Sequence, residues 1–189
     1  MQDLMFGVPT LINNLQHHKE NDMSGIIGTV GARSGIVGSD VYPSGVGAAH
    51  GHVLQVVYSN DVSELSKATT AYEDVGLSAS ITPLSTTNKV LVTWTMQADL
   101  ATADRGFGVK LLRDDGGGYD SLYESATKFD LYAAGSSGGR VRASWAFLDT
   151  PAVTVATTYK IQVGNYNANA MTYNNSGQLT YITLMEVVA

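Results

Sequence analysis

Two histidines separated by one residue, His50 and His52, have the spacing best suited to metal chemistry in this sequence. In an extended segment alternate residues point to the same side, so both imidazoles would face one way. Three such pairs around an axis would supply six nitrogen ligands, enough for octahedral iron or nickel. A solvated pair at the entrance to a domain is the simpler interpretation, and we expect no bound cofactor. His17 and His18 are adjacent, diverge on a helix, and make a poor chelate.

The acidic residues form no recognisable catalytic motif. Asp114, Asp115 and Asp120 flank three glycines, but they lack the alternating ligands and closing Glu of an EF-hand. We predict a hairpin turn there, with a loose calcium loop as the alternative. No Gly-x-Ser-x-Gly nucleophile elbow is present, and residues 53–189 contain neither His nor Cys. Catalysis would have to rest on carboxylates alone, so we predict that the protein is not an enzyme.

Tyrosines beside Gly and Asn mark a candidate binding surface, densest at residues 164–175. Tyr supplies rigid amphipathic area and Asn supplies adaptable hydrogen bonds, a composition typical of binding loops. Two interpretations stay open: a loop that contacts a glycan on a cell surface, or a polar hairpin tip. The predicted contact residues are Asn165, Tyr166, Asn167, Tyr173 and Tyr119.

The composition limits the class of protein. The 189 residues are 44% hydrophobic but only 15% charged, which suits an ordered β-rich domain with many turns. A net charge of −6 with 11 Lys and Arg argues against a nucleic-acid partner, because phosphate binding needs a basic face. No apolar run approaches the roughly 20 residues that span a bilayer. Cysteine is absent, which excludes disulfides.

From residue 51 the sequence consists of short apolar runs separated by turn residues, with no helical period. Trp94 and Trp145 lie within such runs and are predicted to pack in the core. We predict an all-β domain, an antiparallel β-sandwich resembling a jelly roll, over residues 51–189. The expected strands are 53–58, 72–82, 89–97, 106–113, 141–148, 158–164, 171–174 and 178–188, with a further pair around 121–133.

Residues 1–50 are predicted to form an N-terminal anchor. A short helix is expected within residues 4–22, followed by a Gly-rich segment in which Ser-Gly-Ile-Ile-Gly at 24–28 returns as Ser-Gly-Ile-Val-Gly at 34–38. Apolar pairs between glycines cannot fold alone. The segment is either a flexible tether or, as we prefer, an assembly element in which several copies wind together. The residues expected to pack between chains are Ile26, Ile27, Ile36 and Val37.

Several motifs occur in an order that resembles a family of small β-domains from virion proteins of tailed bacteriophages, chiefly marine and cyanobacterial phages. Members often begin with a Met-Ser-Gly-Ile-Ile-Gly leader, present here at residues 23–28. The resemblance covers about residues 23–189, so residues 1–22 precede the usual leader and Met23 is an alternative start. The matching segments are 51–57, 74–83, 88–92, 111–113, 147–151, 157–163 and 183–187.

The resemblance implies a homotrimeric jelly-roll knob in the virion, attached to other virion proteins through residues 1–50. The expected role is a fibre-type adhesin whose knob contacts the host surface. The competing role is a capsid decoration, cement or head-fibre protein that stabilises the shell. The His50/His52 pair also resembles the His-x-His iron sites of some phage fibre shafts.

Overall fold

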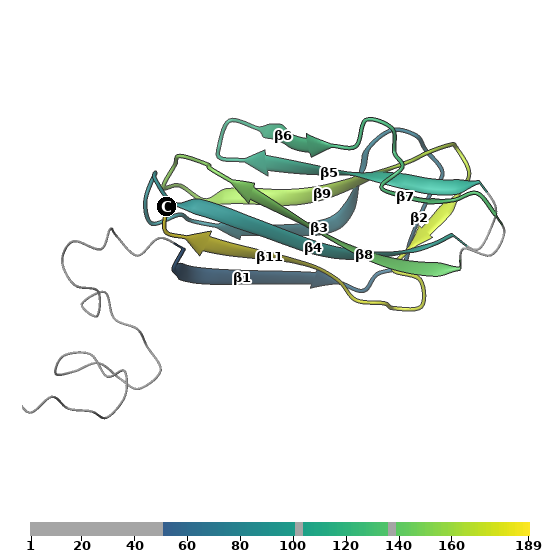
Figure 1. The fold of residues 1–189 in the computed structure, drawn as a ribbon, viewed down its shortest axis with the longest axis horizontal. Helices are drawn as coiled ribbons and strands as arrows, with labels where there is room; N and C mark the ends of the chain where they lie inside the picture. Colours follow the sequence, from purple (N-terminus) through teal and green to yellow (C-terminus); the bar gives the residue numbers. More distant parts are fainter. Residues whose placement is uncertain (1–50, 101–103, 136–138) are drawn as a thin grey trace, which may run out of the picture. The chain divides into compact units, whose positions relative to one another are not determined.

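Residues 51–100, 104–135 and 139–189 are described by the computed structural model, and all regular structure in these ranges is β-strand. Two antiparallel sheets lie face to face as a sandwich, which confirms the predicted fold (Figure 1). Residues 1–50 lie outside the described part. The domain boundary after residue 50 therefore stays a prediction, as do the helix at 4–22, the position of His50 and the packing of Ile26, Ile27, Ile36 and Val37.

The strands agree with the predicted segments to within three residues at each end, and the uncertain pair around 121–133 is also present. One short strand, β2, was not predicted, because three residues are too few to show an alternating pattern. The strands are β1 (Val53–Asp61), β2 (Leu65–Lys67), β3 (Glu73–Ile81), β4 (Lys89–Asp99), β5 (Arg105–Asp114), β6 (Tyr119–Glu124), β7 (Leu131–Ala133), β8 (Arg140–Asp149), β9 (Thr157–Asn165), β10 (Met171–Tyr173) and β11 (Thr180–Val187).

Eight of these strands have the connectivity of a jelly roll. Sheet A contains β1, β11, β4 and β8 as neighbours, and sheet B contains β3, β9, β5 and β6. Except at the β5–β6 hairpin, the chain passes from one sheet to the other between successive strands, which builds two Greek keys. The short strands β2 and β10 extend sheet A, and β7 pairs with the start of β5. The C-terminal strand β11 lies between β1 and β4 in sheet A.

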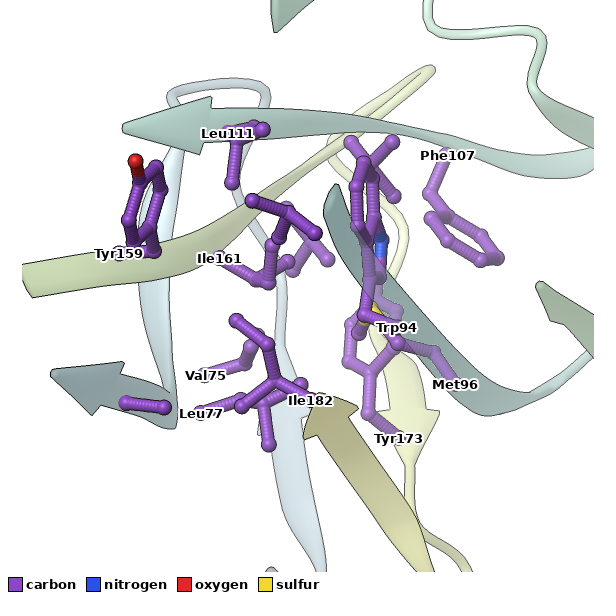
Figure 2. Packing of buried hydrophobic residues seen from close by; sticks show 14 of the residues in the cluster. Val75, Leu77, Trp94, Met96, Phe107, Leu111, Tyr159, Ile161, Tyr173 and Ile182 are labelled. Atoms are coloured by element: carbon purple, nitrogen blue, oxygen red, sulfur yellow. The ribbon is translucent and has the colours of Figure 1, made fainter. Parts of the chain in front are cut away.

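Side chains from both sheets meet in one core (Figure 2). Trp94 and the half-buried Trp145 stack with ring centroids 5.9 Å apart, as expected for core residues. Phe107 meets Trp145 edge-on at 6.4 Å and Tyr173 at 5.3 Å. This aromatic column fills one part of the core, and aliphatic side chains of β3, β4, β5, β9 and β11 fill the rest.

The outer face of sheet B is charged. Its outward residues alternate with core residues along each strand, and several form ion pairs across neighbouring strands. Lys110 lies 2.8 Å from Glu124, and Lys160 lies 3.1 Å from Asp74. A face that holds paired charges is suited to water rather than to an apolar partner.

The outer face of sheet A is apolar along one row that crosses all four strands. Val56, Met185, Leu91 and Leu148 are register partners in this row. Val56 is 58% exposed and Leu148 is 53% exposed. The outward residues in the shared part of the four strands include no carboxylate; they are Val53, Leu54, Val56, Tyr58, Asn60, Lys89, Leu91, Thr93, Thr95, Ser144, Ala146, Leu148, Tyr181, Thr183, Met185 and Val187.

One buried carboxylate joins β11 to its surroundings. Oε1 of Glu186 accepts hydrogen bonds from Leu84 N at 2.7 Å and Asn88 Nδ2 at 2.6 Å, and Oε2 accepts one from Gln55 Nε2 at 2.6 Å. Burial alone would raise the pKa of Glu186. The hydrogen bonds outweigh burial and hold the pKa below its ordinary value of 4.5.

Glu186→Gln is expected to lower the free energy of unfolding at pH 7 by about 2 kcal/mol, the scale of a buried charged hydrogen bond. Because the pKa is depressed in the folded state, this contribution is present above pH 4.5 and is lost as the pH falls through the folded-state pKa. Urea unfolding followed by tryptophan fluorescence at pH 7 and pH 3 measures the difference. An equal effect of the substitution at both pH values would contradict this account.

Candidate functional site

Three aromatic side chains meet at the end of the sandwich where β5 begins and β9 ends. The ring of Phe129, in the β6–β7 loop, lies 4.9 Å from that of Tyr132 and 4.4 Å from that of Tyr166, and the two tyrosine rings are 5.4 Å apart. The three residues nevertheless remain 46%, 41% and 39% exposed, respectively. Exposed apolar patches often mark contact sites. We call Phe129, Tyr132 and Tyr166 the aromatic platform.

Two glycines allow the ring-bearing segment to lie against β5. A Cβ at Gly106 would lie 2.9 Å from the carbonyl oxygen of Leu131 and 2.8 Å from Cδ2 of Tyr132. A Cβ at Gly108 would lie 2.8 Å from Cα of Lys128. These distances leave no room for a larger residue, so the two glycines set the position of the β6–β7 loop and of β7.

Asp104 and Asn167 form a polar border beside the rings. The hydroxyl of Tyr132 donates a hydrogen bond to Oδ1 of Asp104 at 2.8 Å. Asn167 Nδ2 donates to the backbone oxygen of Asp104 at 2.8 Å and to its Oδ2 at 3.2 Å. The hydrogen bond to Asp104 raises the pKa of Tyr132, and burial raises it further. The hydroxyl of Tyr132 is therefore a neutral donor near pH 7.

Of the four contact residues predicted in this loop, Tyr166 and Asn167 are accessible and stay predictions, whereas Asn165 and Tyr173 are buried. Tyr166 is exposed and belongs to the platform, and Asn167 borders it. Asn165 and Tyr173 are fully buried, so neither side chain forms an exposed contact surface. The hydroxyl of Tyr173 donates to Oδ1 of Asn165 at 2.7 Å inside the domain. Satisfying these polar groups with each other makes their burial favourable, and it fixes the loop that carries Tyr166.

Tyr119 does not lie with the other predicted contact residues. It pairs with Asp114 at the far end of β5, eight positions from Gly106 or about 26 Å along an extended strand. Its ring contacts Lys160, whose Nζ lies 3.9 Å from the ring centroid on the ion-paired face of sheet B. The expectation of one surface containing both Tyr119 and Tyr166 is therefore wrong.

Phe129, Tyr132 and Asp104 were missed by the sequence prediction. They lie in separate segments, and none sits in an Asn- and Gly-rich stretch. The available signal was Gly106-Phe107-Gly108, because glycines on one face of a strand indicate that another backbone approaches closely. The two glycines indicate where on β5 another backbone comes close, but they do not show which segment of the chain this is.

The predicted hairpin turn after β5 is confirmed. Oδ1 of Asp114 accepts hydrogen bonds from the backbone nitrogens of Gly116 at 2.8 Å and Gly118 at 3.0 Å. This carboxylate stabilises the turn itself. Within the described ranges no group of three or more His, Asp or Glu residues is arranged to hold a metal ion. His52 is half-buried, and the metal interpretation of the His50/His52 pair is untested.

A second buried carboxylate has a structural role. Oδ2 of Asp149 accepts a hydrogen bond from the hydroxyl of Tyr159 at 2.7 Å, and Arg113 Nη1 lies 3.1 Å from the same oxygen. Burial raises the pKa of Tyr159, and the hydrogen bond to Asp149 raises it further. The three residues come from β5, β8 and β9, so the cluster ties sheet A to sheet B.

Comparison with solved structures finds components of virus particles. They include the infectious bursal disease virus VP2 subviral particle, with a TM-score of 0.45 and 12% identity over 71% of this chain and 38% of that chain. The structure of the Gx strain of the same virus has a TM-score of 0.43 and 13% identity over 71% of this chain and 37% of that chain. The structure of the Gt strain has a TM-score of 0.43 and 10% identity over 72% of this chain and 40% of that chain. The chain thus spans about two fifths of the length of these structures. No protein-family model and no curated sequence matches. The described ranges contain no apolar helix of membrane-spanning length.

Gly106→Ala is expected to displace Tyr132 and lower the free energy of unfolding by about 1–3 kcal/mol, because the added methyl group meets backbone as well as ring atoms. Gly117→Ala is the matched control: its nearest neighbour, Oδ1 of Asp115, is 3.9 Å away, and an effect below about 0.5 kcal/mol is expected. Thermal and urea unfolding measure both variants. Equal stability of the two would contradict the close approach at β5.

Proposed function

We propose that this chain is a non-enzymatic structural and binding protein of a tailed-bacteriophage particle, specifically a homotrimeric fibre-type adhesin. Residues 1–50 attach it to other virion proteins, and residues 51–189 contact the host surface. The resemblance of the sequence to virion proteins of tailed bacteriophages supports a place in the phage particle. The jelly-roll connectivity is compatible with it, because this fold recurs in viral capsid and lectin domains.

The aromatic platform is the observation that carries the adhesin role, since a fold by itself does not define a function. Phe129, Tyr132 and Tyr166 together present apolar ring surface to solvent, and Asp104 and Asn167 place hydrogen-bonding groups beside it. Aromatic residues surrounded by polar groups are typical centres of recognition surfaces. This end of the domain is therefore proposed to meet the host-surface glycan.

The outer face of sheet A supports contact between copies of the chain. A chain with a net charge of −6 repels its copies where acidic residues face each other. The shared outer face of β1, β11, β4 and β8 has no carboxylate and has an apolar row at its centre, so this is where copies approach with least repulsion. Sheet faces also pack on each other, about 10 Å apart.

The same face favours the second candidate function. A capsid decoration, cement or head-fibre protein needs a broad surface against its neighbours in the shell rather than an exposed binding end. Val56 and Leu148 in the apolar row would then contact shell subunits. The two functions differ in copy number and in the effect of losing the protein.

The homotrimer is tested by light scattering of the purified full-length chain. Val56→Asp places a charge in the apolar row and should convert trimer to monomer, because a buried unpaired carboxylate costs several kcal/mol. Val155→Asp is the control, since Val155 is 50% exposed in the loop after β8. Replacement of Ile26, Ile27, Ile36 and Val37 by Ser tests the leader, and should also give a monomer. A monomeric wild type would eliminate the trimer, and a trimeric Val56→Asp chain would eliminate the sheet A contact.

The adhesin and decoration roles are separated on phage particles that lack the protein. For an adhesin we expect a few copies per particle by cryo-EM, and loss of adsorption to host cells with an intact shell. Copy number at capsid stoichiometry, together with a weakened shell and normal adsorption, would replace the adhesin by the decoration role.

A further inference from the structure

We infer that the aromatic platform binds a neutral saccharide, one without carboxylate, phosphate or sulfate groups. This inference rests on the proposed contact with the host surface and specifies the chemistry of its ligand. It follows from two features of the site: the three rings, and the sign of the charge beside them.

The rings suit the apolar face of a sugar ring. Phe129 lies edge-on to Tyr132 at an interplanar angle of 89°, and Tyr132 lies at 76° to Tyr166. These rings therefore point their faces in different directions, and a curved or branched ligand can contact more than one. The face of an aromatic ring is electrostatically negative, so it attracts the weakly positive C–H groups of a pyranose.

The polar border suits hydroxyl groups. An ionised carboxylate only accepts hydrogen bonds and has about four acceptor positions. Asp104 receives one bond from Tyr132 at Oδ1 and one from Asn167 at Oδ2, which leaves acceptor capacity on an exposed side chain. Sugar hydroxyls are donors that match this capacity. A hydrogen bond to a charged acceptor is also stronger than one between neutral groups.

The same carboxylate disfavours an anionic ligand. A sialic acid, uronic acid or sulfate group beside Asp104 would bring two like charges together. Among the described residues, neither neighbouring cation forms an ion pair with Asp104. Lys128 Nζ donates to the backbone oxygen of Thr70 and lies 5.2 Å from the ring centroid of Tyr72. Arg105 occupies an inward-facing position of β5, and its Nε is buried.

The test measures binding of defined probes to the full-length chain by saturation-transfer NMR. The neutral probes are maltotriose, cellotriose and N-acetylchitotriose; the anionic probes are sialyllactose and a heparin tetrasaccharide. We expect at least one neutral probe to bind, and the anionic probes to bind at least tenfold more weakly. Tyr166→Ala should weaken neutral binding about fivefold or more without changing the melting temperature. Tyr119→Ala, which alters an equally exposed tyrosine at the far end, should change nothing.

Asp104→Asn tests the charge directly. Asp104 has a φ of 59°, and Asn tolerates this left-handed conformation, so the backbone should be retained. The variant should bind neutral probes more weakly. The difference in affinity between neutral and anionic probes should also become smaller. An unchanged ratio between the two classes would overturn the role of Asp104.

Attachment of the labelled chain to host cells keeps this inference separate from the proposed function. Attachment that is blocked by anionic probes alone would overturn the neutral ligand and leave the adhesin role intact. Binding of a neutral probe without attachment to cells would support the ligand and overturn the adhesin role. Failure of every probe to bind, with attachment unaffected by Tyr166→Ala, would overturn the platform as the binding site.

Discussion

The side-chain amide of Asn165 lies inside the domain, at the end of β9, where the chain turns outward to the aromatic platform. Its Nδ2 donates to the backbone oxygens of Lys67 and Asn169, both at 2.9 Å, and its Oδ1 accepts from Tyr173. A buried amide that lost these partners would destabilise the fold by about 1–3 kcal/mol per unsatisfied group. The ends of β2, β9 and β10 therefore have to converge on this residue, and Tyr166 leaves the convergence point toward solvent.

The surface of the domain also differs from region to region in whether its polar groups are paired. On sheet B, Lys110 and Lys160 form ion pairs at the surface. In the interior, Arg113 Nη1 and the hydroxyl of Tyr159 both donate hydrogen bonds to Asp149. The sheet A face and the platform keep apolar area in water. The first forms a row across four strands, and the second is small and bordered by polar groups. Their shapes suit different partners, a neighbouring subunit and a small ligand.

The strands were predictable because each is defined by local features. β11 alternates between core residues such as Ile182 and half-buried outer residues such as Thr183, and β5 ends in the Asp114 turn. Alternation and turn residues act over two to eight residues, so they can be recognised without tertiary contacts. The three-residue strand β2 has no such pattern. It forms because it pairs with β10, which lies about 100 residues later in the chain.

The sequence by itself determined the all-β class, the positions of the long strands, the core role of Trp94 and the Asp114 turn, because alternation, apolar content and turn preference are properties of adjacent residues. Only the tertiary structure decided which tyrosines face outward. Tyr166 and Tyr173 share the same Asn-rich neighbourhood, yet one is exposed and the other has its hydroxyl satisfied by Asn165 in the core. The platform likewise depends on Phe129 meeting Tyr166 across 37 residues of chain, a contact set by the close approach at Gly106 and Gly108. Composition can indicate that a residue is suited to binding, but exposure is a property of the folded contacts.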